Sequence, residues 1–66
     1  MDIDFIMAYE DGILSPDEQI AGFAAGITSG MVWQLQGSYG RMAHGLIRAG
    51  YISQTGEILR TAEDED

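Results

Sequence analysis

The 66-residue sequence contains no cysteine, no lysine and a single histidine, His44. Without cysteine the chain cannot form a disulfide, and structural zinc needs several Cys or His ligands, so two common supports of small domains are excluded. A chain of this length buries only about 60% of the surface that its unfolded state exposes. We therefore expect support from regular helix packing or from self-association. The lack of cysteine also fits a reducing cytoplasm.

Positive charge is scarce, because only three basic residues oppose eleven Asp and Glu, which gives a net charge of −8 and a pI near 4.1. Proteins bind nucleic acids by neutralising phosphates with Lys and Arg, and anionic membranes attract the same residues. We therefore predict that neither is a direct partner. An acidic chain suits a protein with a basic surface, and the alternative is that the acidity serves solubility alone.

Long apolar runs are also missing, since none approaches the roughly 18–20 residues of a membrane-spanning helix. The start of the chain, Met1–Ile6, lacks the basic residues and apolar run of a signal peptide. No repeat or internal linker is visible. We predict one domain over residues 1–61, followed by an acidic, disordered tail over residues 62–66.

Two helices are predicted in the first half of the chain. Asp2 can cap the first of them, and Gly12 can end it in the left-handed conformation. The second begins with SPDE, in which Ser15 is the N-cap, Pro16 the first helical residue and Glu18 the partner in a capping box, and it runs to Gly30. The apolar residues expected to pack are Ile3, Ile6, Phe5 and Tyr9 on the first helix, Ile20, Phe23, Ala24 and Ile27 on the second, and Met31 just beyond it.

Small residues form a smooth side of the second helix at Gly22, Ala25, Gly26 and Ser29. Glycine inside a helix costs about 1 kcal/mol relative to alanine, so a close approach of another backbone is expected here. Either the first or third helix packs on this side, or it is a self-association seam between two copies.

A third helix is predicted from Ser38 to Ala49, ended by Gly50. Its core side is Tyr39, Met42, Ala43, Leu46 and Ile47, at helical spacing. After it, Tyr51 and Ile52 are expected to pair with Ile58 or Leu59 across a turn, as a small hairpin that leans on the helices; a helical extension is the alternative.

The stretch Trp33–Ala43, WQLQGSYGRMA, joins the second and third helices. We expect a short helical turn there that Trp33 and Leu35 pin to the core, with Gly37 ending it and Ser38 capping the next helix. Gly40 lets the tryptophan approach that helix. The exposed polar residues predicted to form a protein-binding patch are Gln34, Gln36, Ser38, Arg41 and His44, and the acidic candidates for binding are Asp17 and Glu18.

The predicted fold is mainly all-α, a compact three-helix domain with a possible C-terminal β-hairpin. Three helices and a hairpin also outline a winged helix, but Arg41, His44 and Arg48 are too few to anchor phosphates. An enzyme needs a pocket with convergent groups, and His44 has no cysteine partner, while Ser38 lacks a third group. The acidic pairs lack the calcium-loop pattern. We expect no catalytic residue, no metal and no cofactor.

Three blocks, FIMAYEDG, SGMVWQLQGSYGRMA and LIRAGYI, resemble a widespread family of very small bacteriophage proteins of unknown function. The resemblance spans Met1–Ile52, and WQLQGSYGR is its most specific part, whereas ISQTGEILRTAEDED departs from members that stop soon after the last glycine. It implies a phage origin and action in the cytoplasm of an infected bacterial host. The family has no activity to transfer.

Our hypothesis for the function is binding to another protein, which inhibits or modulates a host factor. An acidic surface can imitate the phosphate array of DNA, and so block a nucleic-acid enzyme or a defence factor. One version is a uracil-DNA glycosylase inhibitor, suggested by DEQI at residues 17–20. The alternative is an accessory phage protein that forms a homo-oligomer, such as a homodimer.

Overall fold

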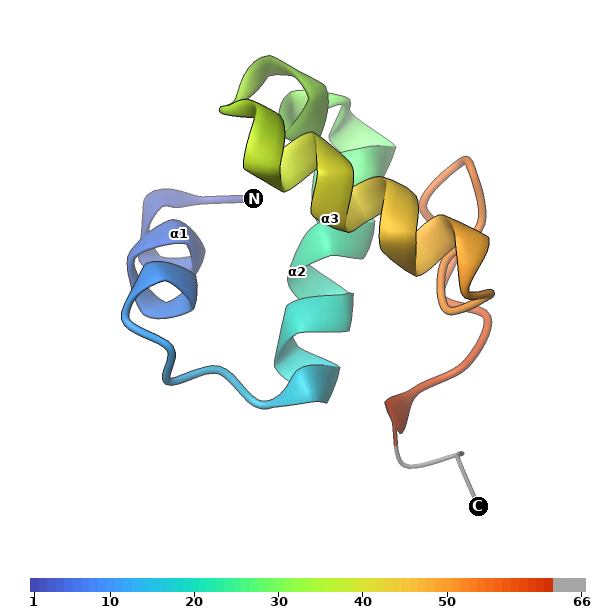
Figure 1. Cartoon of the computed structure of the whole chain (residues 1–66), viewed down its shortest axis with the longest axis horizontal. Coiled ribbons are helices and arrows are strands. Elements are labelled where there is room, and N and C mark those ends of the chain that lie inside the picture. The colour runs from blue at the N-terminus through green and yellow to red at the C-terminus, as the bar shows by residue number, and fades with distance from the viewer. Residues whose placement is uncertain (63–66) are drawn as a thin grey trace.

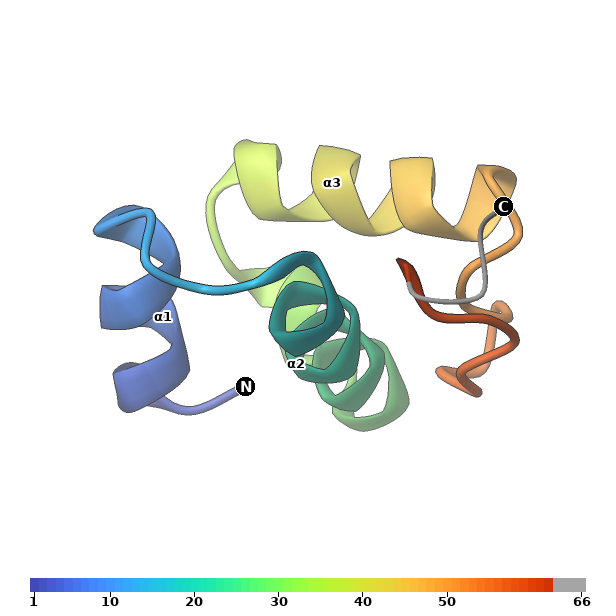
Figure 2. The same ribbon diagram turned by 90° about the horizontal axis from the view of Figure 1, so that it is seen from below.

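The computed structural model describes residues 1–62 as three α-helices and one 3₁₀ helix. These are α1 (Ile3–Glu10), α2 (Pro16–Ser29), η1 (Met31–Gln34) and α3 (Gly37–Arg48). α3 crosses α2, α1 lies beside them at one end of the molecule, and the segment after α3 lies at the other end (Figure 1 and Figure 2). The mainly all-α prediction is confirmed, including the helical turn that contains Trp33.

The helix ends follow local rules, as predicted. The Asp2 carboxylate accepts a hydrogen bond from a first-turn backbone N–H at 2.9 Å. Ser15 and Glu18 form both hydrogen bonds of the capping box, at 3.1 and 2.8 Å. Gly12 and Gly30 adopt φ values of +73° and +82°, in the left-handed region that favours glycine. Each of these features depends only on residues that are close together in the sequence.

The core is built around the predicted stripe of α2. Eight apolar residues are buried, and α3, η1 and the C-terminal segment supply those that α2 does not. Phe23 is fully buried at the centre, where its ring meets three other aromatic rings. The buried residues are Ile20, Phe23, Ala24, Ile27, Val32, Tyr39, Ala43 and Ile52.

The prediction that Trp33 anchors the core is wrong. Trp33 is 45% exposed, whereas its neighbour Val32 is fully buried. A 3₁₀ helix has three residues per turn, so consecutive side chains point in different directions and only one of the two can face α2. Val32 packs against Gly26, where an added Cβ would lie 3.2 Å from the Val32 Cβ. Met31, which was expected to make the apolar contact just beyond the end of α2, is exposed.

The start of α3 also differs from the prediction. α3 begins at Gly37, its N-cap is Gln36, and no side chain caps it. Ser38 therefore lies inside the first turn, and Gly37 does not end η1, because the chain already leaves η1 at Leu35 in an extended conformation. Gly40 does lie beside the Trp33 ring, although an added Cβ there would meet the ring at 3.8 Å, an ordinary contact.

The C-terminal segment forms a turn closed by a single antiparallel bridge between Ile52 and Ile58. The backbone N–H of Leu59 donates to the carbonyl of Tyr51 at 2.8 Å. The predicted pairing is thus present as one bridge, without a regular two-stranded ribbon. Ile52 is fully buried, so the turn packs on the helices. Residues 63–66 of the predicted acidic tail lie outside the described residues.

Candidate functional site

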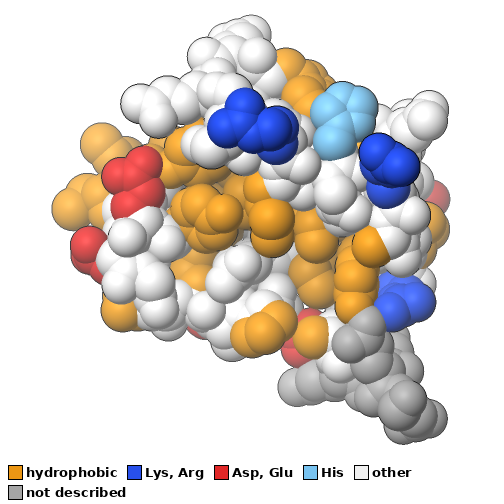
Figure 3. Space-filling view, in the orientation of Figure 1, with side chains coloured by type: hydrophobic (Ala, Val, Ile, Leu, Met, Phe, Trp, Pro, Cys, Tyr) orange, Lys and Arg blue, Asp and Glu red, His pale blue; other side chains and the backbone are white. Residues whose placement is uncertain are grey.

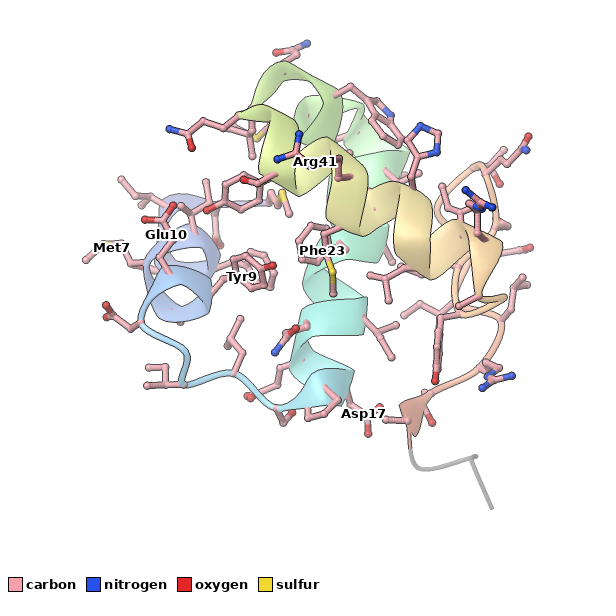
Figure 4. The ribbon with its side chains drawn as sticks, in the orientation of Figure 1. Met7, Tyr9, Glu10, Asp17, Phe23 and Arg41 are labelled. Carbon is pink, nitrogen blue, oxygen red and sulfur yellow. The ribbon has the colours of Figure 1, made fainter. Side chains whose placement is uncertain are left out.

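The end of the molecule formed by α1 and the loop after it exposes three large apolar side chains. Ile3, Met7 and Ile13 are 71%, 59% and 72% exposed. Ile3 and Met7 are four residues apart and therefore share one side of α1, and Met7 points away from the rest of the molecule (Figure 4). The prediction that Ile3 packs in the core is wrong. These three side chains, with the carboxylates of Asp2, Asp4, Glu10 and Asp11, are here called the α1 surface.

The opposite side of α1 is held to α2 by aromatic contacts. The Phe5 ring lies directly on the backbone of Gly22, where an added Cβ would overlap the ring. Phe5 and Tyr9 both meet the Phe23 ring edge-on, with ring centroids 5.7 and 5.3 Å apart. Because an eight-residue helix has one inner side and these rings occupy it, Ile3 faces the solvent.

A hydrogen bond ties the α1 surface to α3. The Tyr39 hydroxyl donates to a carboxylate oxygen of Glu10, Oε2, at 2.6 Å. This hydrogen bond, followed by burial of the phenol and the negative charge of Glu10, raises the pKa of Tyr39 to about 12. Hydrogen bonds to a charged acceptor are stronger than neutral ones, so Tyr39 fixes the Glu10 carboxylate at the rim of the α1 surface.

We expect the hydrogen bond between Tyr39 and Glu10 to make the free energy of unfolding depend on pH in the alkaline range. A group whose pKa is raised from 10.0 in the unfolded chain to about 12 in the folded one gives its full stabilisation below pH 10 and loses it as the pH rises towards 12. Tyr39→Phe should lower the free energy of unfolding at pH 7 by roughly 1 kcal/mol and remove this part of the alkaline loss. Urea unfolding between pH 7 and 12 measures both, and an unchanged alkaline limb in the variant would contradict the assignment.

Basic residues line the outer side of α3, where Arg41, His44 and Arg48 are all exposed, as their spacing predicted. The Trp33 ring packs on the His44 ring, with centroids 5.3 Å apart. Beside them lies an open hollow of about 280 Å³, here called the α3 hollow. Blue arginine and pale-blue histidine atoms share the face seen in Figure 3, whereas red and orange atoms alternate at the α1 end. The hollow is lined by Trp33, His44, Ile47, Arg48 and Gln54.

The residues predicted to bind a partner fall into two separate groups. Asp17 and Glu18 lie at the start of α2, far from Arg41 in Figure 4. Both carboxylates have partners within the chain, because Asp17 accepts from the N–H of Ala62 at 2.7 Å and Glu18 takes part in the capping box. The other group lies on η1, on the residue before α3 and on α3 itself. Its exposed members are Gln34, Gln36, Ser38, Arg41 and His44.

The proposed self-association seam is partly covered within the chain. Phe5 lies on Gly22, and Met1 and Val32 lie on Gly26, so intramolecular packing accounts for both glycines. Ala25 and Ser29 are exposed. Self-association through the remaining small residues stays a prediction.

Sequence reasoning missed the α1 surface, although a signal for it was present. Ile3, Phe5, Ile6, Met7 and Tyr9 place apolar side chains on more of the circumference of the first helix than one buried side requires. The surplus has to face solvent or a partner. Which residues form the surplus depends on how α1 is rotated against α2, and the helix pattern alone leaves that open.

Among residues 1–62, His, Asp and Glu side chains form no group of three or more that could hold a metal ion. Within the same residues, every helix is too short or too polar to span a bilayer.

Comparison with known proteins gives one family. A family model described as a domain of unknown function (DUF7417) matches residues 1–65. No curated protein and no solved structure gave a match to this chain.

Proposed function

The chain belongs to the DUF7417 family, a domain of unknown function, and we propose that it acts by binding another protein through the α1 surface. Three large apolar side chains that remain exposed among carboxylates carry this proposal. Single exposed apolar residues are ordinary, whereas apolar groups gathered at one end and rimmed by charge are typical of interaction sites. The proposal involves no reaction and no cofactor.

The chemistry of the α1 surface defines its partner. Asp4 and Glu10 flank the exposed side of α1 that carries Ile3 and Met7, so a partner must offer apolar contacts between basic side chains. Complementary charges steer association and select partners, while the buried apolar groups supply most of the affinity. Such a surface suits a protein that normally binds nucleic acid.

We place the partner in an infected bacterial cell, where the chain would inhibit or modulate a host protein. The resemblance to small phage proteins and the net charge of −8 support this, because an acidic protein can occupy a basic DNA-binding surface. The version with uracil-DNA glycosylase draws no support from DEQI, since Glu18 caps α2 and Ile20 is buried.

Replacing Met7 with arginine tests the proposal. Arginine keeps the helix propensity but removes an apolar contact and adds a positive charge among the carboxylates. Burial of a methionine side chain is worth about 1.5–3 kcal/mol, so we expect the affinity for a host protein to fall by roughly tenfold or more. The partner is captured from bacterial lysate with the tagged chain, purified, and titrated calorimetrically with each variant.

Leu59→Arg is the matched control, because Leu59 is 57% exposed, close to the 59% of Met7, and lies outside the α1 surface. Its affinity should equal that of the unchanged protein. Equal affinities for all three proteins would remove the α1 surface from the function. Binding should also weaken between about 0.05 and 0.5 M salt, as screening shortens the reach of the carboxylates.

A further inference from the structure

The α3 hollow carries positive charge, whereas the α1 surface carries negative charge. Its walls combine apolar groups, the exposed indole of Trp33 and the side chain of Ile47, with the guanidinium of Arg48. Among residues 1–62, those that line the hollow include no carboxylate, although the chain has a charge of −8. Arg41 extends the positive charge along the same side of α3, two turns from Arg48.

The α1 surface complements this hollow in charge, and both carry apolar side chains. Ile3 and Met7 project from one side of a short helix, and a hollow of about 280 Å³ has room for such a side chain. With Met7 of one copy seated between Trp33 and Ile47 of a second copy, the carboxylates beside Met7 would face the guanidiniums of Arg41 and Arg48. Apolar groups then meet apolar groups, and opposite charges meet at the rim.

We propose that the α1 surface of one copy docks in the α3 hollow of a second copy. The two surfaces lie toward opposite ends of the longest dimension, 31 Å, since α1 occupies one end and the turn that carries Gln54 lies near the other (Figure 1). Met7 also points outward at its end of the molecule (Figure 4), so we expect each copy to contact one neighbour through its α1 surface and another through its hollow. The contact is head-to-tail, and such contacts build open chains or close into rings.

Net charge limits this association without abolishing it. Two copies with a charge of −8 repel each other, but the Debye length is about 8 Å at physiological ionic strength, which is short compared with the 31 Å length of the molecule. Contacts at the docking site are screened less than charges on distant faces. We therefore expect association near 0.15 M salt and weaker association at very low salt, where the long-range repulsion acts unscreened.

The inference concerns a second use of the α1 surface and does not depend on the proposed host partner. A host protein bound at the α1 surface would compete with the second copy. Met7→Arg should weaken the host interaction by roughly tenfold or more and prevent self-association, whereas Arg48→Glu, which alters the hollow alone, should prevent self-association and leave the affinity for the host partner unchanged. Failure of one proposal is thus distinguishable from failure of the other.

Mixing two variants tests the head-to-tail geometry. Met7→Arg disables the α1 surface and keeps the hollow, while Arg48→Glu does the reverse. In sedimentation velocity at 0.15 M salt, the unchanged protein should show a mass that rises with concentration beyond two chains, and each variant alone should remain a monomer. Their equimolar mixture should form a complex of exactly one chain of each kind, because only one intact contact can form. Leu59→Arg should behave as the unchanged protein does.

Trp33 gives a second measurement, because it is the only tryptophan and lies in the hollow. Its emission should shift on dilution of the unchanged protein and stay constant for either variant. Far-UV circular dichroism checks that each variant is folded. Ile3→Arg and Trp33→Ala are substitutes for a variant that is not, and Trp33→Ala, which lacks the fluorophore, is followed by sedimentation alone. A monomeric unchanged protein, association that persists in both single variants, or a mixture that stays monomeric while the unchanged protein associates would each overturn the proposal.

Discussion

Replacement of Phe23 by alanine will leave much of the purified protein unfolded at 25 °C. Phe23 is fully buried, and its ring touches those of Phe5, Tyr9 and Tyr39, with centroids 5.7, 5.3 and 6.2 Å away. Truncating such a residue costs about 3–5 kcal/mol. At about 0.05–0.15 kcal/mol per residue, a chain of 66 residues has only about 3–10 kcal/mol in total. The loss is therefore of the same size as the whole stability.

Trp33→Ala is the informative comparison, because tryptophan is the larger side chain and would be the more damaging loss if size alone decided. Trp33 is 45% exposed and packs on His44 and Gly40 at the edge of the structure. We expect it to cost no more than about half as much as Phe23→Ala, since roughly half of its area is already in water. Urea unfolding followed by circular dichroism measures both, and equal losses would place the indole in the core.

Replacement of Gly56 by alanine will destabilise the protein by about 2–5 kcal/mol. Gly56 has φ +98°, which is strained for any residue with a Cβ and costs about 1–2 kcal/mol. A Cβ there would also lie 2.8 Å from the Ala24 carbonyl oxygen and from the Thr28 backbone nitrogen. These are main-chain atoms of α2 and cannot rotate away. Overpacking of this kind adds about 1–3 kcal/mol.

Gly12→Ala separates the two causes. Gly12 has a similar positive φ of +73°, but among residues 1–62 no atom beyond its two chain neighbours lies within 4 Å of the position that its Cβ would take. This variant should lose only the conformational part, about 1–2 kcal/mol. Gly56→Ala should also speed hydrogen exchange at the Leu59 amide, which donates to Tyr51 in the C-terminal turn, whereas Gly12→Ala should not. Equal losses of stability would show that the contact with α2 is unimportant.

Gly56 illustrates where sequence reasoning stops. Its glycine suggested a turn, which is correct, yet the close contact with Thr28 and Ala24 joins residues about thirty positions apart. The same holds for Gly22 and Gly26. Small residues predicted a close approach to α2, and the partners, Phe5 and Val32, follow only from how the elements are placed in space.

The two candidate binding surfaces also differ in whether the sequence could predict them. The outward position of Arg41, His44 and Arg48 follows from helical spacing, so it could be predicted. The exposure of Ile3 and Met7 could not, because several rotations of α1 would bury an apolar side. The Phe5 ring favours the observed one, since it lies on the backbone of Gly22, where any Cβ would overlap the ring.

The amino-acid sequence alone determined where the helices of this protein begin and end in its first half and which side of α2 is buried. Caps, left-handed glycines and apolar periodicity act over a few residues, so their outcome is readable locally. The tertiary structure decided that Val32 and not Trp33 enters the core, and that Ile3, Met7 and Ile13 remain exposed. Those choices depend on contacts between distant segments competing for one small interior, and no local pattern records which of them wins.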